Sequence, residues 1–121
     1  MIELDHVQIA APSGCEAEAR RFFGDLLGLE ELEKPEPLRS RGGAWFALSE
    51  GGQLHVGVEE PFAPATKAHP AFRLSAEQLD ELAKRLEAAG ERVEWDDALP
   101  GVRRFYTADP WGNRLELLAT D

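Results

Sequence analysis

The stretch Ser13–Gly28, SGCEAEARRFFGDLLG, decides the fold, because a second stretch of the same design follows it. That second stretch is Ser75–Gly90, SAEQLDELAKRLEAAG, and its first serine and last glycine both lie 62 residues after their counterparts. Each stretch begins with a capping-box pattern, S-x-x-E or S-x-x-Q. Each then carries apolar residues at the spacing of one helix face and ends at a glycine, which favours a left-handed C-terminal cap. The sequence therefore predicts two equivalent helices in two halves of the chain.

Segments typical of strands surround both helices in the same order. We predict eight strands, at Leu4–Ala10, Leu29–Glu33, Ala44–Leu48, Gln53–Glu59, Ala68–Leu74, Arg92–Trp95, Val102–Thr107 and Arg114–Leu118. Each half thus has the order strand, helix and three strands. We predict one α+β domain over residues 1–121, with a first βαβββ module at residues 1–60, a linker at 61–67 and a second module at 68–121.

The composition excludes several classes of protein. Thirteen lysines and arginines stand against 23 aspartates and glutamates, a formal net charge of −10. Nucleic acids and anionic membranes repel such a charge, and no apolar run reaches the roughly 20 residues that a membrane helix needs. The single cysteine, Cys15, excludes an intrachain disulfide and zinc sites built from cysteine pairs. Because the acidic N-terminus is unlike a signal peptide, we expect a cytoplasmic protein.

Four side chains that can donate to a metal occupy matching positions in the two halves. His6 and His69 lie in the first strand of each half, 63 residues apart. His55 and Glu116 lie in the last strand of each half, 61 residues apart. Imidazole and carboxylate groups suit Zn, Ni, Fe, Co or Mn. If the halves pack with pseudo-twofold symmetry, these four side chains meet, and we predict that they bind a divalent metal ion.

Other polar or reactive residues have structural interpretations. Alternation along the last strand puts Arg114 on the same face as Glu116. Cys15 has no partner in sequence that indicates a nucleophile, so we expect a packed helix residue. The pair Arg103–Arg104 has two interpretations, binding of an anionic substrate or a solvated pair on an exposed strand, and we favour the second.

Three segments resemble the vicinal oxygen chelate superfamily, which comprises glyoxalases, bleomycin-resistance proteins and extradiol dioxygenases. They are LDHV at 4–7, RFFGDLLGL at 21–29 and, most specifically, DPWGNRLEL at 109–117. The resemblance implies that the two βαβββ modules form a cup-shaped, partly open eight-stranded barrel with the helices outside, and that the chain is a homodimer. It also implies metal ligands at His6, His55, His69 and Glu116, although glyoxalase I commonly has glutamate at the position of His55.

The resemblance further implies a metal-dependent enzyme of glyoxalase type, a lyase or isomerase, that chelates two neighbouring oxygens of a small substrate. Glu116 or His55 is then the group that moves a proton, if it is released from the metal or bound to it weakly. Two alternatives stay open. One is a non-catalytic, bleomycin-resistance-like protein that sequesters a small cationic molecule, which the net charge of −10 suits. The other is a fosfomycin-type thiol transferase. None of these functions needs a nucleic acid or a membrane.

Overall fold

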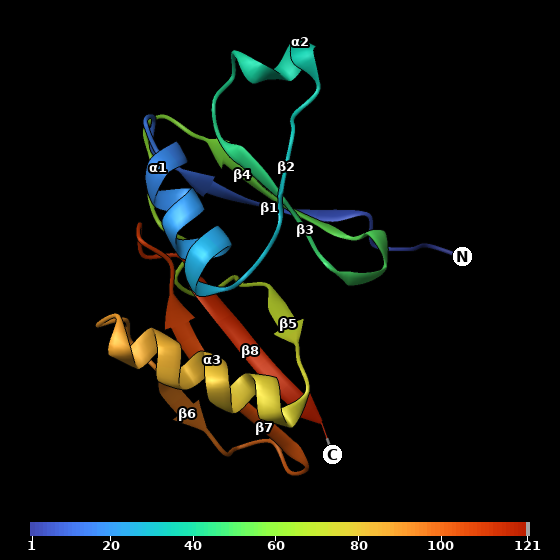
Figure 1. Ribbon diagram of the computed structural model, residues 1–121, viewed down its shortest axis with the longest axis vertical. Helices are drawn as coiled ribbons and strands as arrows, with labels where there is room; N and C mark the ends of the chain where they lie inside the picture. Colours follow the sequence, from blue (N-terminus) through green and yellow to red (C-terminus); the bar gives the residue numbers. More distant parts are fainter. Residues whose placement is uncertain (121) are drawn as a thin grey trace. The chain divides into compact units, whose positions relative to one another are not determined.

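The first four strands form one sheet in the computed structural model, which describes residues 1–120. Their order is β1-β4-β3-β2, with β1 parallel to β4 and the other pairs antiparallel (Figure 1). The first helix follows β1 as a short α-helix, α1, and continues as a π-helix, η1. The element bounds are β1 His6–Ala11, α1 Glu16–Ala19, η1 Arg20–Leu26, β2 Glu31–Leu32, α2 Glu36–Arg39, β3 Ala44–Ala47, η2 Ser49–Gly51 and β4 Gln53–Val58.

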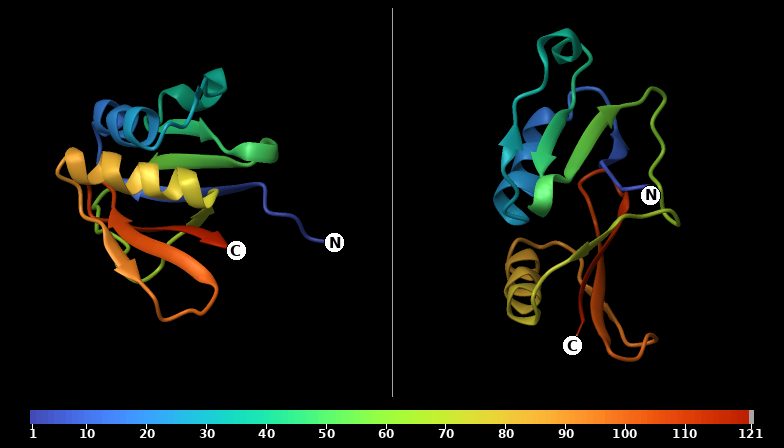
Figure 2. Two further views of the ribbon diagram at one scale, coloured as in Figure 1. Left: turned by 60° about the horizontal axis from the view of Figure 1, so that its bottom comes forward. Right: turned by 90° about the vertical axis from the view of Figure 1, so that its right-hand side faces the viewer.

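The last four strands form a second sheet of the same topology. Their order is β5-β8-β7-β6, with β5 parallel to β8. The helix α3 packs on β8, against one face of this sheet (Figures 1 and 2). The chain divides into two units, of which the first ends at Pro64 and the second begins at Ala65. The bounds are β5 Ala71–Arg73, α3 Ala76–Ala88, β6 Glu94–Asp96, β7 Val102–Ala108 and β8 Arg114–Thr120.

Each unit has the order strand, helix and three strands, so the predicted α+β fold of two βαβββ modules is confirmed. Each sheet packs its apolar face against its own helix, where the largest side chains are fully buried. In the first module these are Phe22, Phe23, Phe46, Leu54 and Val56, and in the second Leu79, Leu86, Phe105, Leu115 and Leu117. No helix among the described residues has the length and apolar character that crossing a bilayer requires.

The two predicted capping boxes have different outcomes. In α3 the Gln78 N–H donates to Ser75 Oγ at 3.1 Å and the Ser75 N–H donates to Gln78 Oε1 at 3.2 Å, which confirms the box. The box at Ser13 is wrong, because the first helix begins after Cys15 and has no side-chain cap. Glu16 is engaged elsewhere: its Oε2 accepts the Gly43 N–H at 2.6 Å, and this bond lowers the pKa of Glu16. Cys15 is buried, which raises the pKa of its thiol and agrees with a packed residue.

A buried carboxylate organises the turn before β8. Asp109 Oδ1 accepts the backbone N–H groups of Trp111 at 3.0 Å and Asn113 at 2.8 Å. Asp109 Oδ2 accepts the side-chain amide of Asn113 at 2.8 Å. Asn113 Oδ1 in turn accepts the Ala65 N–H at 2.9 Å. The turn therefore fixes where β8 begins, and with it the position of every side chain along that strand.

The strand β5 is shorter than the segment Ala68–Leu74 predicted for it, and His69 lies before the strand. Pro70 explains the difference, because proline has no N–H to donate to a neighbouring strand. Its carbonyl oxygen accepts the Glu116 N–H at 3.1 Å, so the residues before β5 still run beside β8. His69 is thus placed by a loop segment next to Glu116.

Candidate functional site

The two histidines of the first module lie in a stack of three rings. His6 begins β1, His55 lies in the neighbouring strand β4, and Trp45 is the cross-strand partner of His55 on β3. The rings of His55 and Trp45 are parallel within 1°, with centroids 3.9 Å apart. The rings of His6 and His55 have centroids 4.3 Å apart and planes inclined by 17°. Because β4 lies between β1 and β3, the His55 ring lies between the other two.

Hydrogen bonds fix which nitrogen of each ring carries a proton. His6 Nδ1 donates to the Asp5 carboxylate at 2.8 Å, which leaves the lone pair of neutral His6 on Nε2. His55 Nε2 donates to Gln53 Oε1 at 2.8 Å, which leaves its lone pair on Nδ1. Burial lowers the pKa of His55, and the neighbouring charge of His6 adds to this effect. His55 is only 6% exposed and is therefore neutral at pH 7.

In the second module His69 and Glu116 face each other directly. His69 Nε2 lies 3.0 Å from Glu116 Oε1. His69 Nδ1 donates to the carbonyl oxygen of Lys67 at 2.8 Å, so the lone pair of the neutral ring is on Nε2 and points at the carboxylate. Two acceptors at this distance need a cation on or beside them, either a proton on the ring or a metal ion. The Glu116 side chain is 8% exposed, so water offers little screening.

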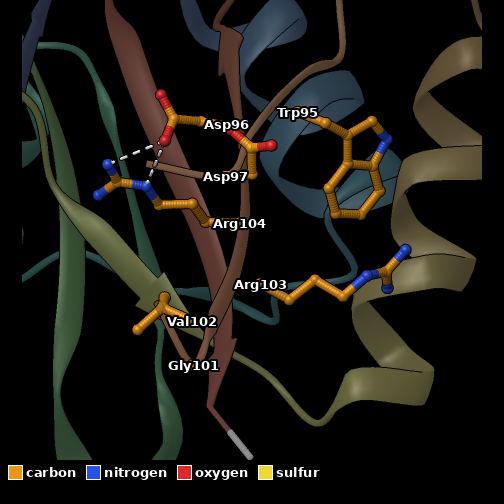
Figure 3. Close-up of a pocket in the computed structure, with 7 residues that line it drawn as sticks. All are labelled: Trp95, Asp96, Asp97, Gly101, Val102, Arg103 and Arg104. Atoms are coloured by element: carbon orange, nitrogen blue, oxygen red, sulfur yellow. Dashed lines mark hydrogen bonds and ion pairs between the residues drawn. The ribbon is translucent and has the colours of Figure 1, made fainter. Parts of the chain in front are cut away.

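Arg104 holds the other oxygen of Glu116. Its Nη1 donates to Glu116 Oε2 at 3.4 Å, and its Nη2 donates to Asp96 Oδ1 at 3.1 Å. The Arg104 side chain is 18% exposed, so the prediction of a solvated arginine pair is wrong for this residue. The reason is strand alternation. Figure 3 shows Arg104 turned toward Asp96, whereas Arg103 extends the other way past Trp95.

Arg104 and Asp96 also line an open cavity of about 570 Å³ at the β6–β7 hairpin (Figure 3). Its other lining residues are Trp95, Asp97, Gly101, Val102 and Arg103. The Ala98 N–H and the Arg104 guanidinium both stabilise the Asp96 carboxylate and lower its pKa. The cavity is therefore bounded on one side by a charge pair that reaches Glu116 directly.

Tyr106 lies beside the His69–Glu116 pair of the second module. It is the cross-strand partner of Glu116, and its ring contacts His69 edge to face at a centroid distance of 5.5 Å. The Arg114 guanidinium carbon lies 3.9 Å from its centroid, and that of Arg104 lies 5.4 Å away. Alternation along β8 places Arg114 on the same face as Glu116, as predicted. Its contact with Tyr106 depends on the pairing of β7 with β8, for which the sequence carries no local signal.

The structure thus brings the four predicted residues together as two pairs, His6 with His55 and His69 with Glu116. In residues 1–120, no group of three or more His, Cys, Asp or Glu side chains is arranged so that it could hold a metal ion. Within each pair the donor chemistry nevertheless fits a metal. His69 binds a backbone carbonyl and His6 a carboxylate through Nδ1, as metal-ligating histidines commonly do, and each keeps Nε2 for a ligand.

Two βαβββ modules, each with a donor pair on the side of its sheet away from the helix, define a class of small α+β proteins. The chain belongs to the Glyoxalase/Bleomycin resistance protein/Dioxygenase superfamily, whose family model matches residues 3–117. Members of this superfamily commonly use divalent metal ions and bind small molecules. The predicted family is therefore confirmed.

Solved structures agree with this assignment. A glyoxalase family protein from Bacillus anthracis is 47% identical, with a TM-score of 0.94 over 100% of this chain and 97% of that one. The fosfomycin resistance protein FosX from Listeria monocytogenes is 21% identical, with a TM-score of 0.76 over 100% of this chain and 95% of that one. Lactoylglutathione lyase from Agrobacterium tumefaciens is 24% identical, with a TM-score of 0.72 over 97% and 92%. The last two share the fold alone. No curated protein sequence matches the chain.

Proposed function

We propose that the protein is a metal-dependent enzyme of glyoxalase type, a lyase or isomerase that acts on a small substrate through two neighbouring oxygens. His6, His55, His69 and Glu116 are its metal-binding residues. The observation that carries the proposal is the His69–Glu116 pair. Its nitrogen and oxygen face each other at 3.0 Å, with the other nitrogen of the ring held by Lys67 and the other oxygen of the carboxylate held by Arg104.

The surrounding residues orient these donors for a cation. Lys67 fixes the tautomer of His69, and Arg104 fixes the rotation of the Glu116 carboxylate. Asp5 fixes the tautomer of His6 in the same way. His55 differs, because its Nε2 already donates a hydrogen bond to Gln53. To bind a cation, His55 either breaks this bond and uses Nε2 or uses the lone pair on Nδ1. We therefore expect His55 to contribute less to metal affinity than His6, His69 or Glu116.

A divalent ion with open positions acts as a Lewis acid on a substrate that offers two neighbouring oxygens. The chain itself supplies the groups that move protons. Neutral His55 carries a lone pair on Nδ1, and burial keeps that ring uncharged at pH 7. Glu116 is an alternative acceptor, with Arg104 in position to stabilise its negative charge. Either group takes a proton when it is released from the metal or weakly bound to it. Trp45 and His6 hold the His55 ring in one orientation through the stack.

Elemental analysis of untagged protein tests the proposal first. We expect about one equivalent of Zn, Ni, Mn, Co or Fe per chain, or uptake of one equivalent on incubation with these ions. His69→Gln and Glu116→Gln should lower the affinity for the metal by more than the roughly 10- to 100-fold that loss of a group supporting a ligand typically causes, because each removes a ligand itself. The matched control is Glu94→Gln, which removes the same charge from an exposed side chain of the same sheet.

Two outcomes decide between the proposal and its alternatives. A protein that stays metal-free with every ion, or one whose affinity is unchanged in both site variants, refutes the metal site. Stoichiometric, metal-independent binding of a cationic glycopeptide would instead identify a sequestering protein. If metal binds, metal-dependent turnover of a hemithioacetal supports glyoxalase chemistry, whereas metal-dependent addition of a thiol to fosfomycin identifies a thiol transferase. A homodimer in the cytoplasm remains a prediction, which light scattering and cell fractionation can check.

A further inference from the structure

Arg114 is held by an aromatic ring rather than by a carboxylate. Its guanidinium carbon lies 3.9 Å from the centroid of the Tyr106 ring. Among residues 1–120, no carboxylate lies within ion-pair distance of this guanidinium. Arg103 and Arg104 of the neighbouring strand contrast with it, because each forms an ion pair, Arg103 with Asp80 and Arg104 with Asp96 and Glu116. Arg114 therefore has no direct carboxylate partner among the described residues of its own module, and Asp96, which is paired with Arg104, interacts with its charge only at longer range.

A stacked guanidinium keeps its hydrogen-bond donors. The ring covers one flat face, while the N–H groups lie in the guanidinium plane and point outward from its edge. Such an edge binds a carboxylate or phosphonate through two parallel hydrogen bonds. Stacking on Tyr106 also removes much of the side chain's rotational freedom before any ligand arrives, so less entropy is lost on binding. Arg114 is half-buried, which reduces screening by water.

The position of Arg114 relates it to the donor pair of the second module. Arg114 and Glu116 are two residues apart on β8, on one face of the sheet and with Cα atoms about 7 Å apart. Tyr106 links them, because it is the cross-strand partner of Glu116 and contacts both His69 and Arg114. A small molecule bound at the His69–Glu116 pair can thus extend to the edge of the Arg114 guanidinium.

We propose that Arg114, supported by Tyr106, binds an oxyanion of the substrate, a carboxylate or a phosphonate. The substrate is then a small anion with two neighbouring oxygens at one end and the charged group at the other. This inference deepens the proposed function and rests on it for the metal-binding end of the substrate. It runs against the expectation from the net charge of −10, which suits a cationic ligand.

Tyr106 offers a direct test, since it is the only tyrosine of the chain. Protein labelled with 3-fluorotyrosine gives one fluorine resonance, which reports on the ring that carries Arg114. Metal-free protein is titrated with acetate and with methylphosphonate, and with acetamide and sodium chloride as controls for shape and ionic strength. We expect a saturable shift with at least one of the two anions and none with acetamide. The anion that binds more tightly identifies the oxyanion class.

The variants decide whether Arg114 is responsible. Arg114→Gln should abolish the saturable shift, and Arg114→Lys should weaken binding because an ammonium lacks the two-pronged edge. The matched control Arg73→Gln removes the same charge from an exposed residue of the same sheet and should leave binding unchanged. Circular dichroism confirms that each variant is folded. An unchanged titration in Arg114→Gln, or no saturable shift in the wild type, overturns the proposal.

A second measurement separates this inference from the metal-dependent function. Succinate monohydroxamate carries a metal-chelating end and a carboxylate, and its amide analogue carries the same chelating end without the charge. In metal-loaded wild type and Arg73→Gln we expect the carboxylate form to bind about tenfold more tightly, and in Arg114→Gln we expect no preference. If metal strengthens the binding of neither hydroxamate, the metal-dependent function fails. The fluorine titration then still decides the role of Arg114.

Discussion

Replacing Asp109 with alanine should destabilise the second module and disturb the start of β8. The Asp109 carboxylate is 4% exposed and accepts three N–H groups, those of the Trp111 backbone, the Asn113 backbone and the Asn113 side chain. Alanine removes all three bonds without changing the backbone. Asp109→Asn keeps one acceptor oxygen but turns an NH₂ group toward a donor, so its effect should be smaller.

The magnitude follows from the number of bonds. A hydrogen bond contributes about 1 kcal/mol net, and one to a charged acceptor about 1.5–3 kcal/mol. Burial raises the pKa of Asp109, which means that desolvation of the charge offsets part of this gain. We therefore use the lower value and expect a loss of about 3 kcal/mol for Asp109→Ala, and about 1–2 kcal/mol for Asp109→Asn. For a domain of this size the first value corresponds to a fall in Tm of about 12 °C.

Thermal unfolding followed by circular dichroism, with urea unfolding at 25 °C as a second measure, checks these values. The control is Asp97→Ala, which removes the same charge from an exposed loop residue. Metal affinity should also fall in Asp109→Ala, since Glu116 follows the turn on the same strand. If Asp109→Ala unfolds within about 2 °C of the control, the turn does not depend on this carboxylate and the reasoning is refuted.

Three further changes test other parts of the structure. Thr107 is fully buried and its hydroxyl has no hydrogen-bond partner among the described residues, so Thr107→Val should raise the free energy of unfolding by about 1 kcal/mol; a loss of stability would contradict this. Ser75→Ala should cost about 1 kcal/mol because it removes the N-cap of α3, whereas Ser13→Ala, which removes no cap, should be nearly neutral; equal effects on the urea midpoint would refute the distinction. The pKa of His55 lies below its ordinary value of 6.5, mainly through burial. The unfolded chain therefore takes up this proton first as the pH falls, and stability should decrease from pH 7.5 to 5.5. His55→Gln should show a weaker decrease, and an identical pH dependence would exclude His55 as a cause.

The fold was predictable from the sequence because each module repeats strong local signals. Apolar spacing identified the helix of each half, and buried Phe22 and Leu86 lie on the predicted faces. The capping box predicted at Ser13 does not form, because the Glu16 carboxylate accepts the backbone N–H of Gly43 instead. Gly43 lies 27 residues away in the sequence, so no local pattern reveals this partner. The predicted length of β5 was wrong for a local reason. Pro70 cannot donate a backbone hydrogen bond, so strand pairing begins only after it, although apolar residues surround it.

The candidate site was predictable only in part. Repeat positions identified His69 and Glu116, which the structure places in contact. They did not reveal that the His55 ring lies between Trp45 and His6, because that arrangement follows from the order of strands in the sheet. The sequence also predicts a solvated Arg104, because neither the direction of its side chain nor its partners on neighbouring strands follow from a local pattern. Its ion pairs come from Asp96 on one neighbouring strand and Glu116 on the other.

The parallel pairing of the first and last strands in each module has a consequence for protein synthesis. β1 finds its partner only in β4, and the paired residues His6 and Gln53 are 47 positions apart. At about 5–20 residues per second, the ribosome takes roughly 2–10 s to make that stretch. Until then the nascent β1 lacks the neighbour that completes its hydrogen bonds. The sheet of the first module is therefore complete in sequence before β5 is translated, and the two sheets can form one after the other as the chain grows.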